Sequence, residues 1–313
     1  MLNPNYAETY HNLGIALYDQ GKLEDSIEVY NKVLLLKPDY AEAYNSLGNA
    51  FKDQGKLDEA LENYNKAFLC KPDYADAYFN IGVVFKDQGK FDKAIKGFNK
   101  FLLLKPDHAE AYNNLGVTLH EQGKLNEAID SYKKSISLKV DYAEAYNNLG
   151  VTLQAQGKFD EAIKTYNKSV SLKSDYAQAY NNIGVTLKDQ DELDKALKAY
   201  KKSISLKPDY AEAYSNMGLT LHSQGKLNKA IKAHNKSISL RPNFCDAYCN
   251  KGGALHDQGK FDEAIDSYKK SIFLKPDYAE AYNNMGVAFQ SQGKLEDALE
   301  TYKKSISLKP NYA

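Results

Sequence analysis

The sequence predicts an all-α solenoid, because one 34-residue unit is repeated nine times without a gap from Ala7 to Tyr312. The fourth copy reads AEAYNNLGVTLHEQGKLNEAIDSYKKSISLKVDY, and each copy contains two apolar stretches with helical spacing. A fixed period of this length is typical of arrays in which each repeat buries its apolar face against its neighbours. We therefore expect a single domain over residues 1–313, with repeats beginning at residues 7, 41, 75, 109, 143, 177, 211, 245 and 279.

Each repeat is predicted to be a helical hairpin whose ends are marked by residue type. The first helix should open at Asp-Tyr-Ala-Glu, where Asp39 can cap the free amides and Glu42 completes a capping box. It should end at a glycine such as Gly55, which can adopt the left-handed conformation. The second helix should end before Pro72 and its counterparts, because proline cannot continue a helix. Within the first helix, we expect the fourth, seventh, eighth and eleventh residues to face the core.

Two kinds of departure from the repeat pattern fall close together in the chain. Val140 and Ser174 stand where the other repeats have proline, and Asp191 replaces the glycine of the turn between the two helices. Each change weakens a local stop or turn signal. We therefore expect residues 140–192 to be the softest part of the array.

Composition restricts the classes of partner. Lysine plus arginine and aspartate plus glutamate are equal at 41 each, so the chain has no overall positive field for nucleic acid or an anionic membrane. No apolar run approaches the roughly 20 residues that cross a bilayer, and the first residues lack the features of a signal peptide. The three cysteines are too few for a disulfide framework. We expect a cytoplasmic protein that binds neither nucleic acid nor membrane.

The pattern of Tyr at the fourth place, Leu-Gly at the seventh and eighth, Ala at the twentieth, Tyr at the twenty-fourth and Pro at the thirty-second resembles the tetratricopeptide repeat family. The resemblance covers 306 of 313 residues. It implies a right-handed superhelix of antiparallel helix pairs, with the first helices lining a concave groove that binds peptides or proteins. It implies no catalytic activity.

The predicted binding residues are asparagines on the face of the first helix opposite the core. The sixth place is asparagine in eight of nine repeats, with serine in the second: Asn12, Asn80, Asn114, Asn148, Asn182, Asn216, Asn250 and Asn284. Asn113, Asn147 and Asn181 at the fifth place join them. An amide offers donors and an acceptor, so a row of amides can bond the backbone of an extended peptide whatever its side chains. The row is similar to the asparagine ladder in the repeat arms of O-linked N-acetylglucosamine transferases. Alternatively, these asparagines are solvated residues copied by duplication of the repeat.

The same face is predicted to be acidic. The second place carries a carboxylate in eight repeats: Glu8, Glu42, Asp76, Glu110, Glu144, Glu212, Asp246 and Glu280. Part of this pattern has a local cause, since acids near a helix start complement the helix dipole. We expect ligands that are neutral or basic, and not the acidic tails that other tetratricopeptide domains bind through lysine and arginine clamps.

No catalytic, cofactor or metal residues are predicted. Cys245, Cys249 and His256 share one side of a helix, but only His222 could complete a ligand set, so we interpret them as ordinary groove residues. Two functions of different classes remain open. The chain is a scaffold for partner proteins, or it is the substrate-selecting arm of a larger enzyme such as a glycosyltransferase. Because the array is cut at the same phase at both ends, we expect a piece of a longer protein.

Self-association is predicted at two places. The twenty-ninth place holds Leu35, Leu69 and Leu103 in consecutive repeats where most others have serine, which would give an apolar stripe on the second helices. The last second helix, with Tyr302, Ile306 and Leu308, has no following repeat to cover its side. Either surface could contact another copy of the chain.

Overall fold

The computed structural model describes residues 5–309, which divide into two compact parts with their boundary after Gln156. Each part is described by itself. The N-terminal half contains α1 (Asn5–Asp19), α2 (Leu23–Leu36), α3 (Ala41–Asp53), α4 (Leu57–Cys70), α5 (Ala75–Asp87), α6 (Phe91–Leu104), α7 (Ala109–Glu121), α8 (Leu125–Leu138) and α9 (Ala143–Ala155). The C-terminal half contains α10 (Phe159–Leu172), α11 (Ala177–Asp189), α12 (Leu193–Leu206), α13 (Ala211–Ser223), α14 (Leu227–Leu240), α15 (Cys245–Asp257), α16 (Phe261–Leu274), α17 (Ala279–Ser291) and α18 (Leu295–Leu308).

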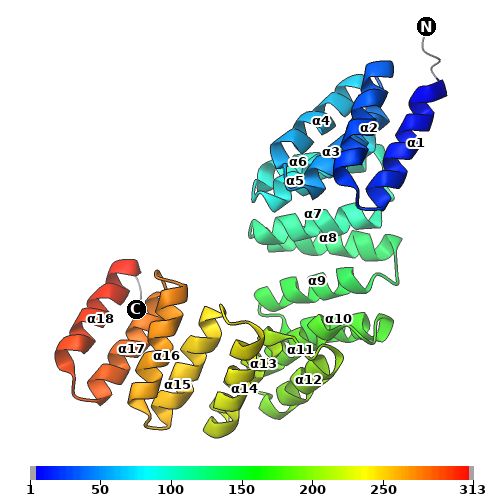
Figure 1. The fold of residues 1–313 in the computed structure, drawn as a ribbon. Helices are drawn as coiled ribbons and strands as arrows, with labels where there is room; N and C mark the ends of the chain where they lie inside the picture. Colours follow the sequence, from blue (N-terminus) through cyan, green and yellow to red (C-terminus); the bar gives the residue numbers. More distant parts are fainter. Residues whose placement is uncertain (1–4, 310–313) are drawn as a thin grey trace. The chain divides into compact units, whose positions relative to one another are not determined.

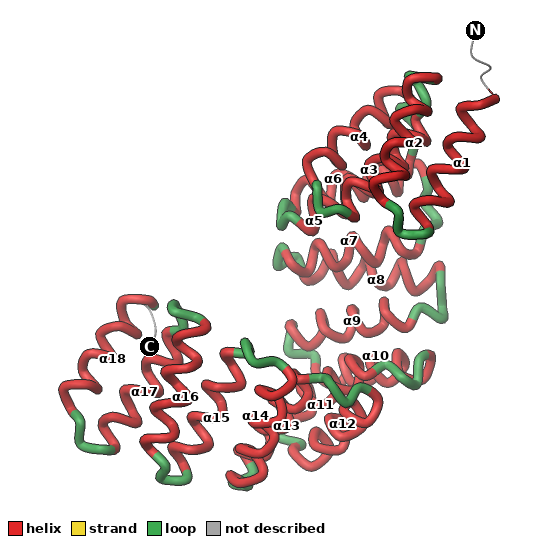
Figure 2. The backbone as a smooth tube through the Cα atoms, viewed as in Figure 1, coloured by secondary structure: helices red, strands yellow, loops and turns green. Residues whose placement is uncertain are grey.

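Within each part, the two helices of a repeat pack on each other, and the second helix also packs on the first helix of the next repeat. In the N-terminal half α3 packs on α4, and α4 on α5; in the C-terminal half α15 packs on α16, and α16 on α17. Short loops join the helices (Figures 1 and 2), and residues 5–309 contain no strand. The fold is an all-α solenoid of helical repeats, as the sequence predicts.

The glycine turn between the two helices is confirmed. Gly55 has φ +77°, and seven further turn glycines also have positive φ. In the sixth repeat Asp191 takes the same left-handed conformation, with φ +60°. Aspartate tolerates this region better than most residues because its short side chain bonds locally, but it is less favourable there than glycine. The turn geometry therefore survives the loss of its usual residue.

The predicted capping box is wrong by one residue. α3 begins at Ala41, and its N-cap is Tyr40, which makes no side-chain cap hydrogen bond. The carbonyl of Tyr40 accepts from the backbone amides of Ala43 and Tyr44, so Asp39 lies one place before the cap. A side-chain cap does occur at α7, where His108 accepts from Ala111 N at 3.2 Å. Helix stops agree better with the sequence: α8 and α10 end at the usual leucine although Val140 and Ser174 replace proline.

The core of a repeat is built around a glycine and an aromatic ring. In α3, a Cβ atom on Gly48 would lie 2.5 Å from Cε1 of Tyr64, so only glycine lets the ring of α4 approach. The tyrosine at this twenty-fourth place is fully buried in repeats 1, 2, 4, 5, 6 and 8, and Phe98 and His234 replace it in repeats 3 and 7. The fourth-place tyrosine, predicted to be core, is half-buried in most repeats. The third and tenth places, which were not predicted to face the core, hold fully buried small side chains such as Ala43 and Ala50.

Candidate peptide-binding face

Several half-buried sixth-place asparagines donate hydrogen bonds to the preceding repeat. Nδ2 of Asn80 donates to Oδ1 of Asn45 at 2.9 Å, and Nδ2 of Asn148 donates to Oδ1 of Asn113 at 3.1 Å. In the C-terminal half, Nδ2 of Asn216 donates to Oδ1 of Asn181 at 3.0 Å. Each bond joins the sixth place of one repeat to the fifth place of the repeat before it. The row is therefore partly a packing device, which sequence reasoning missed.

The fifth-place asparagines lie deeper than predicted. Asn113, Asn147 and Asn181 are only 1–6% exposed, so they support the sixth-place amides from below and present little surface to a ligand. The sixth-place residues are half-buried in repeats 2–9, while Asn12 in the first repeat is exposed. An amide has two N–H donors and one carbonyl oxygen, so a single bond to the preceding repeat leaves bonding capacity on the outer side.

Two sixth-place residues have different partners. Nδ2 of Asn114 donates to the backbone oxygen of Glu110 at 3.1 Å, and its Oδ1 accepts from Nζ of Lys86 at 3.3 Å. Nδ2 of Asn284 donates to Sγ of Cys249 at 3.8 Å. Cys249 takes the place of the fifth-position asparagine, and burial raises the pKa of its thiol to about 12. The thiol is thus an acceptor within the row and carries no negative charge at neutral pH.

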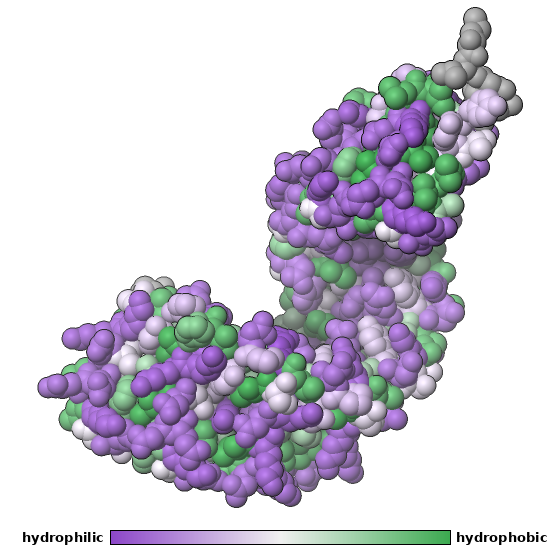
Figure 3. Space-filling view, viewed as in Figure 1, coloured by the Kyte–Doolittle hydropathy of each residue, from purple (hydrophilic) through white to green (hydrophobic). Residues whose placement is uncertain are grey.

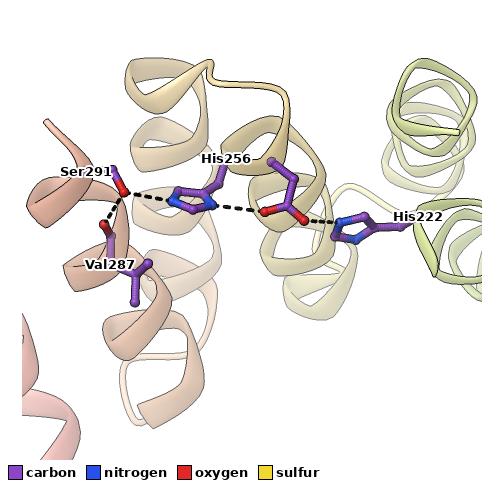
Figure 4. Close-up of polar contacts among 5 residues, drawn as sticks. His222, His256, Val287 and Ser291 are labelled. Carbon is purple, nitrogen blue, oxygen red and sulfur yellow. Dashed lines mark hydrogen bonds and ion pairs between the residues drawn. The ribbon is translucent and has the colours of Figure 1, made fainter. Parts of the chain in front are cut away.

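A second row of polar contacts passes from α13 to α15 and on to α17 (Figure 4). Nε2 of His222 lies 2.7 Å from Oδ2 of Asp257, and the other oxygen of Asp257 lies 3.1 Å from Nδ1 of His256. Nε2 of His256 lies 3.0 Å from Oγ of Ser291, which donates to the backbone oxygen of Val287. Hydrogen bonding from His222, and then from His256, lowers the pKa of Asp257. The repeat phase could have revealed this row, because it links the twelfth place of one repeat to the thirteenth of the next.

The acidic second place is partly neutralised by the base that follows the second helix of the same repeat. Oδ1 of Asp76 lies 2.7 Å from Nζ of Lys105, and Oε1 of Glu42 lies 3.5 Å from Nζ of Lys71. Glu212 pairs with Arg241. These side chains are well exposed, so each pair contributes little to stability. They do reduce the negative field that the sequence predicts for this face. Glu110 and Glu144 form no ion pair within residues 5–309.

The cysteine and histidine residues of α15 do not converge. Within residues 5–309, no group of three or more His, Cys, Asp or Glu side chains is placed to hold a metal ion. Over the same residues, no helix is both long enough and apolar enough to span a bilayer.

The residues predicted for self-association have mixed exposure. Leu35, Leu69 and Leu103 are 83%, 71% and 78% exposed. On α18, Ile306 is 60% exposed, while Tyr302 and Leu308 are half-buried, and the hydroxyl of Tyr302 donates to Gln290 at 2.9 Å. The exposed side of α18 is made instead by Ile306 with two leucines that the sequence analysis did not name, Leu295 and Leu299.

Comparison with known proteins identifies the repeats. A TPR repeat model matches residues 16–55, 48–89, 84–123, 118–157 and 252–293. Two models of the tetratricopeptide repeat match residues 141–209 and 175–243, and residues 279–312. No curated protein matches the chain.

Similar solved structures include MamA, which is 28% identical over 52% of this chain and 95% of its own, with a TM-score of 0.47. YrrB, described as a TPR protein with an unusual peptide-binding site, is 23% identical over 59% of this chain and 95% of its own, with a TM-score of 0.46. The APC/C hetero-tetramer Cut9-Hcn1 is 16% identical over 92% of this chain and 56% of its own, and its TM-score of 0.65 shows a shared fold. Since the repeat models match well over half of its residues, the chain belongs to the tetratricopeptide repeat family.

Proposed function

We propose that this protein is an interaction scaffold that binds an extended peptide, or an extended segment of a partner protein, along its first helices. The observation that carries the proposal is the recurrence of a half-buried amide at the same place in repeat after repeat. Bonds such as Asn80 to Asn45 and Asn148 to Asn113 fix the orientation of the amides before a ligand arrives. Preorganised groups lose less freedom on binding, so they bind more tightly than free side chains.

The remaining bonding capacity suits a peptide backbone. An outward N–H and carbonyl oxygen on one amide can bond the C=O and N–H of one extended residue. Selectivity would then come from side chains around the row, including the histidines and carboxylates at the twelfth and thirteenth places. We retain the preference for neutral or basic ligands, although ion pairs such as Asp76 with Lys105 weaken its electrostatic basis.

The test replaces Asn114, Asn148 and Asn182 together by alanine. With each amide contributing roughly 0.5–1.5 kcal/mol, affinity should fall by tens of fold or more. The probe is the tightest-binding peptide selected against the full chain from a random displayed library, and affinity is measured by calorimetry. The matched control replaces Asn31, Asn65 and Asn99, three exposed asparagines on the second helices, and should bind as the unmodified protein does. Unchanged affinity in the first variant, with the helical circular dichroism signal intact, would refute the ladder.

A second candidate is the substrate-selecting arm of a larger enzyme such as a glycosyltransferase. It rests on the asparagine row, which resembles that of the transferase arms. The sequence of the full reading frame tests it directly: a catalytic domain joined to the array would support this candidate, and its absence would remove it.

We also propose contact between copies of the chain through the leucine stripe of Leu35, Leu69 and Leu103. Serine fills this twenty-ninth place in repeats 4–7 and 9, so the repeat does not require an apolar residue there. Replacing all three leucines by serine should therefore preserve the fold and shift sedimentation towards the monomer. A monomer at all concentrations before substitution would contradict the contact.

A further inference from the structure

A groove in the C-terminal half has an apolar floor and a rim of lysines. It lies between α12, α13 and α14 and has a volume of about 430 Å³. The floor is formed by Leu197, Tyr214, Met217, Leu221 and Ala233. Leu197, Leu221 and Ala233 are buried in one hydrophobic cluster, against which Met217 packs. None of the floor residues belongs to the asparagine row, so the groove is a separate surface.

The rim consists of Lys201, Lys226, Lys229, Lys232 and Lys236. Lys226 donates to Gln224 at 2.6 Å, and no lysine of the rim forms an ion pair within residues 5–309. Residues 193–240 contain nine lysines but only three carboxylates, and α14 contains no carboxylate. Glu212 already pairs with Arg241, and Asp194 accepts from Gln224 at 3.0 Å. The positive charge around the groove is therefore largely uncompensated.

This charge is not required by the fold. The same places line a groove two repeats further along, between α16, α17 and α18. There Tyr282, Met285 and Phe289 occupy the positions that correspond to Tyr214, Met217 and Leu221. There, however, the nineteenth and twenty-second places are Asp297 and Glu300 instead of Lys229 and Lys232. Lysines three and four places apart on one helix, as on α14, repel each other and destabilise it. An anionic ligand would relieve that repulsion.

We propose that the groove between α12, α13 and α14 binds an acidic peptide segment whose carboxylates alternate with apolar side chains. The lysines on the rim would pair with the carboxylates, and the apolar floor would take leucine or phenylalanine side chains from the same segment. A peptide fits better than nucleic acid, because bases bind chiefly by stacking on aromatic rings, and the floor has one ring, Tyr214, among aliphatic side chains. It also fits better than a membrane surface, because the apolar residues lie recessed below the lysines and do not project from the surface. The asparagine row is proposed to bind a peptide through its backbone. This groove instead selects a peptide by its charge and its apolar side chains.

The test uses a short fluorescein-labelled peptide in which glutamate alternates with leucine and phenylalanine, titrated with the full chain at low salt. Changing Lys229→Asp together with Lys232→Glu gives this groove the charges of its counterpart at Asp297 and Glu300, so the variant should fold normally. Reversing two exposed charges should weaken binding by about 30-fold. The reciprocal variant, Asp297→Lys with Glu300→Lys, should gain a second binding site for the peptide.

Two further probes separate the classes of ligand. A peptide with serine in place of leucine and phenylalanine should bind at least about tenfold more weakly, because it leaves the floor empty. A single-stranded oligonucleotide and vesicles of anionic phospholipid should not compete with the acidic peptide at matched charge. The proposal is overturned if the Lys229 and Lys232 variant binds unchanged, if the serine peptide binds equally well, or if either competitor displaces the peptide. The variant lacking Asn114, Asn148 and Asn182 should bind this probe normally, so failure of one proposed site is distinguishable from failure of the other.

Discussion

Repeats 7 and 8, residues 211–244 and 245–278, are neighbours with the same helix lengths and turn glycines but different interiors and surfaces. Repeat 8 has Tyr268 in the core and three acids on α16, while repeat 7 has His234 in the core and no acid on α14. Both rings lie against a glycine of the first helix, Gly218 in one repeat and Gly252 in the other. The backbone of a repeat is therefore fixed by a few contacts. The charge and chemistry of its other places can change while the helices keep their bounds.

The largest effect should come from breaking the contact between glycine and ring that occurs inside both repeats. A Cβ atom on Gly252 would lie 2.5 Å from Cε1 of Tyr268, so Gly252→Ala should destabilise the C-terminal half by about 1–3 kcal/mol. At the adjacent Gly253, the nearest atom to such a Cβ is 3.6 Å away. Gly253→Ala should be neutral or stabilise the helix by up to about 1 kcal/mol. Urea unfolding followed by circular dichroism measures both, and equal effects of the two variants would contradict this packing argument.

The next effect concerns His234, which is fully buried, and neither of its ring nitrogens has a hydrogen-bond partner among residues 5–309. In repeat 3 the corresponding residue is the fully buried Phe98, so His234→Phe should fit the core of repeat 7. Removing two buried, unpaired polar atoms should stabilise the protein by about 1–3 kcal/mol at neutral pH. Tyr268→Phe is the matched control in repeat 8 and should change the free energy of unfolding less. A loss of stability in His234→Phe would show that the imidazole has a partner in solution.

The same histidine makes repeat 7 sensitive to acid. Burial, with smaller contributions from His222 and Lys251, lowers the pKa of His234 to about 3. The unfolded chain binds a proton near the ordinary pKa of about 6.5, so the unfolded state is favoured progressively as pH falls from about 6.5 towards 3. The stability advantage of His234→Phe should therefore widen over that range. Unfolding curves collected at several pH values test this, and a constant difference between the two proteins would contradict it.

The smallest effect concerns a hydrogen bond between repeats. Nε2 of Gln292 donates to the carboxylate of Asp262 in α16 at 2.7 Å, while Nε2 of Gln258 donates to the amide oxygen of Asn228 in α14 at the same distance. A charged acceptor near a helix start is favoured by the bond and by the helix dipole. Asn228→Asp should therefore stabilise repeat 7 by about 0.3–1 kcal/mol, and Asp262→Asn should destabilise repeat 8 by a similar amount. Thermal unfolding of both variants shows whether the changes have opposite signs.

Local signals in the sequence were sufficient to predict most of the fold. The apolar period, the turn glycines and the proline stops act within a few residues of one another, so they can be read directly. The helix starts were misplaced because the choice between Asp39 and Tyr40 as the cap depends on which carbonyl accepts the first helical bonds. The buried third and tenth places were missed because the preceding repeat covers them: Ala43 clusters with Val33, and Ala50 with Tyr30. A single helical wheel does not include that neighbour.

The candidate site was harder to predict, for a related reason. The asparagine row was visible, but the bonds from Asn80 to Asn45 and from Asn216 to Asn181 join residues 35 positions apart. The pairing of Asp76 with Lys105 spans 29 positions and changes the charge of the face. Neither distance follows from helix periodicity alone. Both follow once each place is compared with the corresponding places of its own and the adjoining repeat.

The bonds between glutamine and the eighteenth place have a consequence for how such an array changes in length. Gln54 reaches Glu24, Gln122 reaches Asp92, Gln224 reaches Asp194 and Gln292 reaches Asp262, always across 30 positions. Removing or inserting a whole repeat places another glutamine opposite another eighteenth-place acceptor. The same hydrogen bond therefore forms at the new junction. A deletion of any other length would place the glutamine opposite an unrelated side chain. Repeats joined in this way can take one another's place. The array can therefore gain or lose repeats in steps of 34 residues and keep the same contact between neighbours.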